Sequence, residues 1–145
     1  MGKGIVIAFG AFDILHPGHI HYLKEAGRYG RLVVVVARDE SIAKLKGKRP
    51  LMDERSRLAI ISSLRVVDKA ILGSRIGRLD DMYNVMLKVK PSVVALGYDQ
   101  KVDMKYLKDF LTAHRMGPRI VRISSYRKEL FKSSKIKDAA GLTGR

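Results

Sequence analysis

The chain of 145 residues contains no cysteine and no tryptophan. Without cysteine, neither a disulfide framework nor a metal site built on thiolates can form. Its apolar runs are too short to cross a bilayer, and no signal-peptide pattern precedes the first of them, Ile5–Phe9. These absences predict a cytoplasmic protein with no membrane partner.

Acidic residues are also few, since 14 Asp and Glu stand against 29 Lys and Arg, giving a formal net charge of +15. This excess favours anionic partners, either nucleic acid or small polyanions, although a basic solvated surface gives the same count. No basic stripe interleaved with aromatic residues occurs, which disfavours stacking on single-stranded bases. A nucleic-acid-binding module therefore stays open only as an alternative from a different functional class.

The rest of the composition is that of one folded domain, with 46% hydrophobic residues. Apolar runs rich in β-branched residues recur at Ile5–Phe9, Leu32–Ala37, Ala70–Leu72, Val93–Leu96 and Ile120–Ile123. Helices are expected between and after them, at Ile20–Tyr29, Glu54–Leu64, Asp80–Lys90, Asp103–Met116 and Ser133–Ala140. This alternation predicts a single-domain α/β fold over residues 1–145, a Rossmann-like doubly wound sheet of about five parallel strands. Residues 141–145 are expected to be a frayed tail.

His16-Pro17-Gly18-His19 follows the first expected strand and opens the first expected helix. Pro17 suits the first helical position, where its missing N–H has no partner to lose. Two imidazoles three residues apart share one helix face. Because a helix N-terminus carries free N–H donors and partial positive charge, it attracts phosphate. The stretch therefore predicts a phosphate-binding site at His16 and His19.

Ligands of open parallel sheets bind outside the carboxyl ends of the strands. Segments that follow the expected strands should therefore converge, and they contain polar or glycine residues at 10–16, 38–39, 97–100 and 124–127. The lysine-rich stretch within Ala37–Pro50 is predicted to be a mobile loop that closes over the ligand.

Gly10-Ala11-Phe12-Asp13, followed by His16 to His19, resembles the opening motif of the HxGH nucleotidylyltransferases, the superfamily of cytidylyltransferases and class I tRNA synthetases. Two later segments are similar in the same order. The middle one runs from Lys46-Gly47-Lys48-Arg49-Pro50 through Arg57-Leu58 to Leu64-Arg65-Val66-Val67-Asp68, and the C-terminal nucleotide-binding motif spans Arg127–Ile136. Within the superfamily, Leu96-Gly97-Tyr98-Asp99-Gln100 and the overall layout look most like the archaeal-type FAD synthases.

The resemblance implies transfer of a nucleoside monophosphate from a nucleoside triphosphate to a phosphate acceptor. The preferred substrates are ATP and FMN, giving FAD and pyrophosphate. The alternative is a CTP-dependent cytidylyltransferase acting on glycerol-3-phosphate or a related polyol or sugar phosphate. Leu130 and Lys132 count against that alternative, because cytidylyltransferases commonly have small residues there. A divalent metal such as Mg²⁺ and a homodimer are further implications.

The resemblance also implies roles for individual residues. The catalytic set is His16, His19, Lys46 and Arg127. The nucleotide-binding set is Gly10, Ala11, Phe12, Gly18, Asp99, Gln100, Tyr126, Ser133 and Ser134. The acceptor-binding set is Asp39, Lys48, Arg57 and Arg65. Ala11 stands where the family usually has Thr or Ser, which removes one hydroxyl contact to the phosphates.

Several of these residues have a structural alternative. Asp13 either holds the metal, which would be bound mostly through substrate phosphates, or ties down the turn by accepting backbone N–H bonds. Arg57 and Arg65 bind the acceptor phosphate or support the fold. The alternative for Asp99-Gln100 is a capping turn, and the alternative for Ser133-Ser134 is a helix cap. His21 and His114, outside the implied site, are expected to be structural or exposed.

Overall fold

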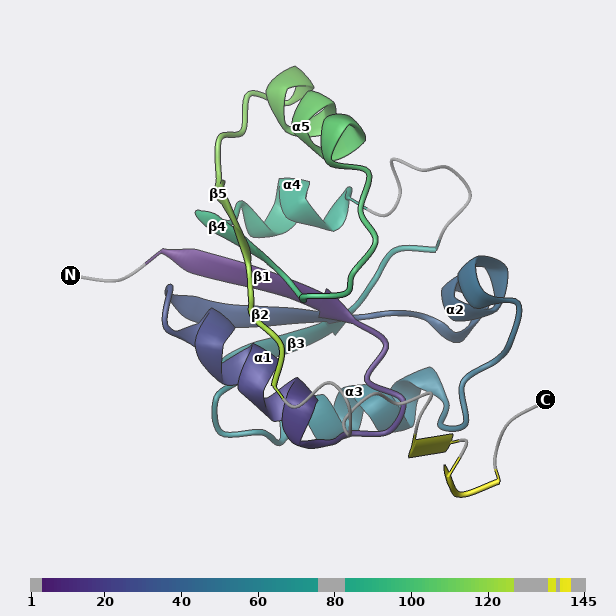
Figure 1. The fold of residues 1–145 in the computed structure, drawn as a ribbon. Coiled ribbons are helices and arrows are strands. Elements are labelled where there is room, and N and C mark those ends of the chain that lie inside the picture. The colour runs from purple at the N-terminus through teal and green to yellow at the C-terminus, as the bar shows by residue number, and fades with distance from the viewer. Residues whose placement is uncertain (1–3, 76–82, 127–135, 138, 142–145) are drawn as a thin grey trace.

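The computed structural model describes residues 4–75, 83–126, 136–137 and 139–141. Five strands form one sheet: β1 Ile5–Gly10, β2 Arg31–Val36, β3 Lys69–Leu72, β4 Val93–Leu96 and β5 Arg119–Arg122. All paired strands are parallel, in the order β3-β2-β1-β4-β5 (Figure 1). The predicted Rossmann-like α/β fold is thus confirmed, with a topological switch point between β1 and β4.

Within residues 4–75 and 83–126, the helices that connect or flank the strands are α1 Pro17–Gly27, α2 Asp39–Lys46, α3 Glu54–Ser62, α4 Val85–Val89 and α5 Met104–Ala113. Figure 1 shows α1 and α3 on one face of the sheet and α4 and α5 on the other. The helix α2 lies beyond the carboxyl ends of the strands (Figure 1). No helix in the described parts of the chain is both long and apolar enough to span a membrane.

The strands are apolar throughout because both faces of the sheet are covered. Along β1, Val6 and Ala8 point into the core beneath α1 and α3, while Ile7 points into the core beneath α4 and α5. Successive strand side chains alternate between faces, so a strand buried on both sides needs an uninterrupted apolar sequence. The result is a central β1 whose end is held rigidly where the ligand-binding edge begins.

The predicted loop at Lys44–Arg49 is wrong over its first half, because Lys44–Lys46 form the end of α2. Acidic residues occupy the first turn of α2 and lysines the last, which complements the helix dipole at both ends. Gly47, with φ of 72°, then ends the helix in the left-handed region that favours glycine. The lysines at the end of α2 are therefore presented by a helix rather than by a free loop.

The other expected helices differ mainly at their ends. The third was expected over Asp80–Lys90, and the described helix is Val85–Val89, with residues 80–82 outside the described part. Most of the expected helix Ser133–Ala140 also lies outside it, although residues 136–137 and 139 are helical. Of the expected frayed tail, only residue 141 is described.

Candidate active site

The turn between β1 and α1 places both histidines of the motif at the start of α1. His16 is the N-cap residue, and its Nδ1 accepts a hydrogen bond from the Gly18 backbone N–H at 3.1 Å. His19 Nδ1 accepts in return from the His16 backbone N–H at 3.3 Å. The two rings stack with centroids 3.8 Å apart and planes 22° apart. The predicted shared face is confirmed, and the two imidazoles form the reciprocal capping box usually made by Ser or Thr with Glu or Gln.

This cap fixes the protonation pattern of both rings. Because Nδ1 of each ring accepts a backbone N–H, the proton of a neutral imidazole must sit on Nε2. Burial is the main cause that lowers the pKa of His19 to about 3, with further lowering by the charges of His16 and Lys46. Burial also lowers the pKa of His16, which the nearby Asp99 carboxylate partly opposes. At neutral pH both residues are uncharged Nε2–H donors.

Phe12 supports His19 from the turn. Its ring meets the His19 ring edge-on, with centroids 5.3 Å apart, and its side chain is buried. Phe12 has φ of 54°, an uncommon conformation for an aromatic residue, so the surrounding turn must hold it there. A Cβ on Gly10 would lie 2.6 Å from the Phe12 ring, so glycine at position 10 makes room for that ring.

The loop after β4 is pinned to the end of β1. The Gln100 side chain accepts from the Gly97 N–H at 2.7 Å and donates to the Phe9 carbonyl at 2.8 Å. Arg122 donates to the carbonyls of Gly97 and Gln100, each at 2.8 Å. The amide of Gln100 therefore holds this loop in place, while Asp99 lies within the electrostatic reach of His16.

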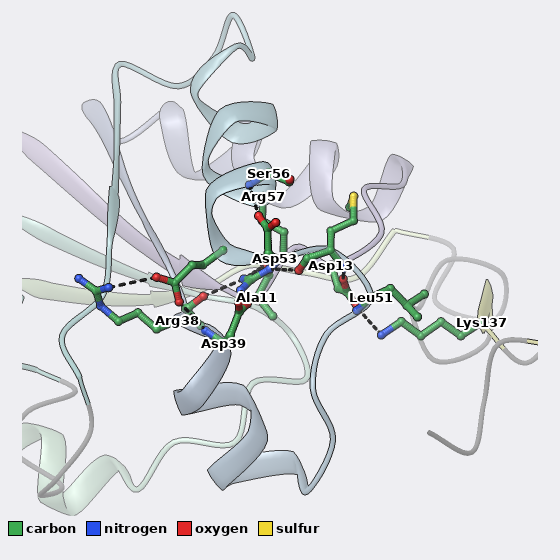
Figure 2. Close-up of polar contacts among 12 residues, drawn as sticks. Ala11, Asp13, Arg38, Asp39, Leu51, Asp53, Ser56, Arg57 and Lys137 are labelled. Atoms are coloured by element: carbon green, nitrogen blue, oxygen red, sulfur yellow. Dashed lines mark hydrogen bonds and ion pairs between the residues drawn. The ribbon is translucent and has the colours of Figure 1, made fainter.

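Arg57 contacts the start of the same turn and is fully buried (Figure 2). Its guanidinium donates to the carbonyls of Ala11 at 2.8 Å, Ala37 at 2.7 Å and Met52 at 2.9 Å, and to the Asp39 carboxylate at 2.6 Å. These bonds join the ends of β1 and β2, the start of α2 and the segment before α3. The geometry favours the fold-supporting alternative for Arg57, and it commits one oxygen of Asp39 to the same network.

Asp13 is the second buried charge of this network, and its side chain is 6% exposed. Its two oxygens accept the backbone N–H groups of Leu51 at 2.8 Å and Met52 at 2.9 Å, and the Lys137 ammonium pairs with it (Figure 2). Burial raises the pKa of Asp13, but the bonds from Lys137, Met52 and Leu51 together hold it below its usual value. The turn-tying alternative for Asp13 fits this arrangement.

Asp13 does not fit the metal role, because both of its oxygens are engaged and an ammonium group occupies its open side. Within residues 4–75, 83–126, 136–137 and 139–141, no group of three His, Asp or Glu side chains is arranged to hold a metal ion.

Glu54 is a functional neighbour that the sequence interpretation did not single out. Its carboxylate accepts from the Asp39 backbone N–H at 2.9 Å and from the Arg38 guanidinium at 3.1 Å. Arg38 in turn donates to the Gly73 carbonyl at 2.7 Å, which ties α2 to the end of β3. The signal in the sequence was an acidic residue at the first position of a helix that Asp53 caps.

The remaining predicted site residues divide into three groups. Lys46, at the end of α2, acts electrostatically on His19, and Lys48 is exposed just beyond it. Arg65 does not join the site: it is exposed beyond the end of α3, in the connection that leads into the amino end of β3. The third group, outside the described residues, is Arg127, Ser133 and Ser134.

A cavity of about 590 Å³ opens beside His16. Its other lining residues are Leu15, Pro17, Ile20, His21, Lys24 and Tyr126. The rings of His21 and Tyr126 stack with centroids 5.4 Å apart and planes 27° apart. His21, which was expected to be structural or exposed, forms part of this wall. Among the described groups, none is hydrogen-bonded to its buried Nε2. Such a wall suits a flat, partly polar ring.

Known proteins share both the sequence and the fold. The profile of the family described as cytidylyltransferase-like matches residues 7–139. A curated protein named FAD synthase from Thermoplasma volcanium is 51% identical over 91% of this chain and 90% of its own length. The FAD synthase of Thermoplasma acidophilum is 50% identical over the same shares.

One solved structure supports the same grouping. A crystal structure of a protein named for lipopolysaccharide core biosynthesis, from Thermoplasma volcanium, is 52% identical, covers 84% of this chain and 97% of its own, and superposes with a TM-score of 0.75. Taken with the paired histidines at the strand-end edge, these likenesses confirm the predicted superfamily. The chain belongs to the cytidylyltransferase-like family of nucleotidyltransferases.

Proposed function

We propose that this protein is an FAD synthase, which transfers the AMP group of ATP to the phosphate of FMN and releases pyrophosphate. The observation that carries nucleotidyl transfer is the pair of neutral Nε2–H donors at the N-terminus of α1, beside the switch point. The choice of FMN as acceptor is supported by the FAD synthase names of relatives at 50% and 51% identity.

The chemistry needs little beyond placement and charge stabilisation. A phosphate monoester is already mostly ionised near pH 7, so the FMN phosphate oxygen attacks the α-phosphorus without a general base. As the bond to the pyrophosphate oxygen breaks, negative charge grows on the leaving group. The Nε2–H groups of His16 and His19 donate to these oxygens, and each such donor contributes roughly 10²–10³ in rate.

Lys46 supplies the nearest positive charge on this side. It stands at the last position of α2 and lies close enough to His19 to depress its pKa. Its ammonium would bind triphosphate oxygens, whereas Lys48 and Asp39 on the same side stay predicted contacts for the acceptor. The predicted phosphate contacts of Arg127, Ser133 and Ser134 also stay predictions, as do a divalent cation carried by the substrate phosphates, a homodimer and a cytoplasmic location.

We place the adenine ring in the cavity beside His16. The stacked pair of His21 and Tyr126 offers an aromatic wall, and the apolar side chains of Leu15 and Ile20 line the same space. This position continues directly from the histidine pair, as a base does from its phosphates.

The direct test is an incubation of the purified protein with FMN and either ATP or CTP, followed by chromatography of the flavins. We expect FAD and one equivalent of pyrophosphate with ATP and no flavin product with CTP. A parallel incubation supplies glycerol-3-phosphate or a sugar phosphate as the acceptor, because the solved relative from Thermoplasma volcanium is named for lipopolysaccharide core biosynthesis, a different process. No flavin product with either nucleotide would overturn the proposal.

A further inference from the structure

We propose that Lys137 is a positioning residue, which holds the chain at position 137 to the β1–α1 turn through its ion pair with Asp13. This inference rests on the proposed function for its kinetic consequence but not for its structural one. Lys137 directly follows the stretch Arg127–Ile136 that resembles the nucleotide-binding motif. The Asp13–Lys137 pair joins residues separated by 124 positions in the chain.

The anchor for Lys137 is a buried carboxylate rather than a surface one. The Asp13 side chain is 6% exposed and the Lys137 side chain 23% exposed. A buried carboxylate is costly unless it is paired and hydrogen-bonded. Lys137 supplies the pairing cation, and the Leu51 and Met52 N–H groups supply the hydrogen bonds. The pair is therefore unlike an exposed ion pair such as Lys105–Asp109, whose side chains are 88% and 68% exposed.

The anchor is also rigid, because it belongs to a closed circuit of bonds (Figure 2). Asp13 accepts from Met52 N–H, the Met52 carbonyl accepts from Arg57, and Arg57 donates to the carbonyl of Ala11, two residues before Asp13. Movement of the turn would break several of these bonds at once. A lysine that binds this circuit is held relative to the turn that also carries His16 and His19.

Lys137 and the predicted phosphate-binding residues before it therefore have different roles. Lys137 need not touch substrate, since its ammonium is bound to Asp13. Because the pair holds Lys137 to the turn before nucleotide binds, less conformational entropy is lost at Lys137 on binding. Loss of the pair should therefore weaken ATP binding while leaving the chemical step at the histidines nearly unchanged.

The test compares Lys137→Met, Lys137→Arg and the exposed control Lys105→Met in the full-length protein. We expect Lys137→Met to raise KM for ATP by about tenfold or more, as loss of a charge-assisted hydrogen bond does, with kcat changed by less than about twofold. Lys137→Arg should restore most of the loss, and Lys105→Met should match the wild type. Equal behaviour of Lys137→Met and Lys105→Met, or a fall in kcat at unchanged KM, would contradict the proposal.

Hydrogen exchange without substrate provides a second readout. Amides of residues 136–137 and 139–141 should exchange faster in Lys137→Met than in wild type or Lys105→Met. Asp13→Asn should produce at least the same increase, because it removes the ion pair and also one of the two acceptors of the Leu51 and Met52 N–H groups. The double variant should therefore match Asp13→Asn alone. Unchanged exchange in Lys137→Met would sink the fastening role. This readout also separates the fastening role of Lys137 from the proposed FAD synthase activity. If the wild-type protein made no FAD, hydrogen exchange would still differ between the wild type and Lys137→Met.

Discussion

The two sides of the β1–α1 turn use their polar groups in opposite ways. On one side, Asp13 and Arg57 are buried, and the protein itself supplies four hydrogen-bond acceptors for the guanidinium and three donors for the carboxylate. His16 and His19, by contrast, cap α1 through Nδ1, which places the proton of each neutral ring on Nε2. The comparison separates residues whose polar groups are satisfied within the fold from the two that we propose to bind the substrate.

The largest expected effect separates capping from catalysis at the histidines. His16→Asn with His19→Gln keeps good capping residues at both positions but removes the two imidazoles. We expect turnover to fall by roughly 10⁴–10⁶, the product of the two donors' contributions, while thermal unfolding stays within a few degrees of wild type. The paired alanine variant should lose as much turnover and, in addition, about 1–2 kcal/mol of stability, because the cap is lost. Equal stability of the two variants would show that the imidazoles do not act as the cap.

The next effect is on stability, at Arg57. Arg57→Met removes the guanidinium and leaves the Asp39 carboxylate and three carbonyls without their donor. Breaking a buried charge pair in this way costs about 3–5 kcal/mol, which urea unfolding would measure. The control is Arg55→Met on the exposed side of the same helix, expected to change stability by less than about 0.5 kcal/mol. If folded Arg57→Met lost far more turnover than its loss of stability explains, Arg57 would instead be assigned to substrate binding.

The buried histidines predict a characteristic dependence of stability on pH. Because the pKa of His19 is about 3 in the folded protein and about 6.5 when unfolded, only the unfolded chain binds this proton between those values. Stability therefore falls as pH decreases from about 6.5 toward 3, by at most about 1.4 kcal/mol per pH unit from this group. Asp13 has a pKa below its usual value, so its contribution is lost only below about pH 4. Urea unfolding between pH 7 and 4 measures the slope, which His16→Asn with His19→Gln should flatten.

The smallest expected effect is at Gln100. This residue was predicted to bind nucleotide, but its side-chain amide bonds to backbone groups of the fold. Gln100→Ala removes the bonds to Gly97 N–H and the Phe9 carbonyl. We expect a loss of about 1–2 kcal/mol of stability and a change in KM for ATP of less than about threefold. Lys101→Ala, next to it and exposed, is the control. A rise in KM by tens of fold at unchanged stability would assign Gln100 to the nucleotide instead.

The sequence predicts the sheet well because β-branched apolar runs have few alternatives when both faces are covered. All five expected strands occur, each within one residue of its expected position at either end. The helix α2 was missed because a short lysine-rich stretch reads as a loop. The helix α2 is favoured by acidic residues in its first turn and lysines in its last. It is also favoured by Glu54 of α3, which is distant in sequence and accepts the Asp39 backbone N–H.

The sequence predicts the local geometry of the site but not its contacts between distant segments. Spacing alone places His16 and His19 on one face, since three residues span one helical turn. The partners of Asp13, Arg57 and Gln100 are backbone groups of distant segments, which only the folded chain brings near. Arg65 was grouped with the site by motif order, but α3 leads away from the strand-end edge before reaching it.

Proton-detected ¹⁵N spectra of the histidine rings at pH 7, recorded with and without ATP, test the central claim most directly. We expect neutral His16 and His19 with protonated Nε2 and unprotonated Nδ1, since both Nδ1 atoms accept backbone bonds. Addition of ATP should shift the Nε2 resonances of both rings and leave Nδ1 as an acceptor. A proton on Nδ1 in the free protein, or Nε2 resonances that ATP does not move, would contradict the division between cap and substrate.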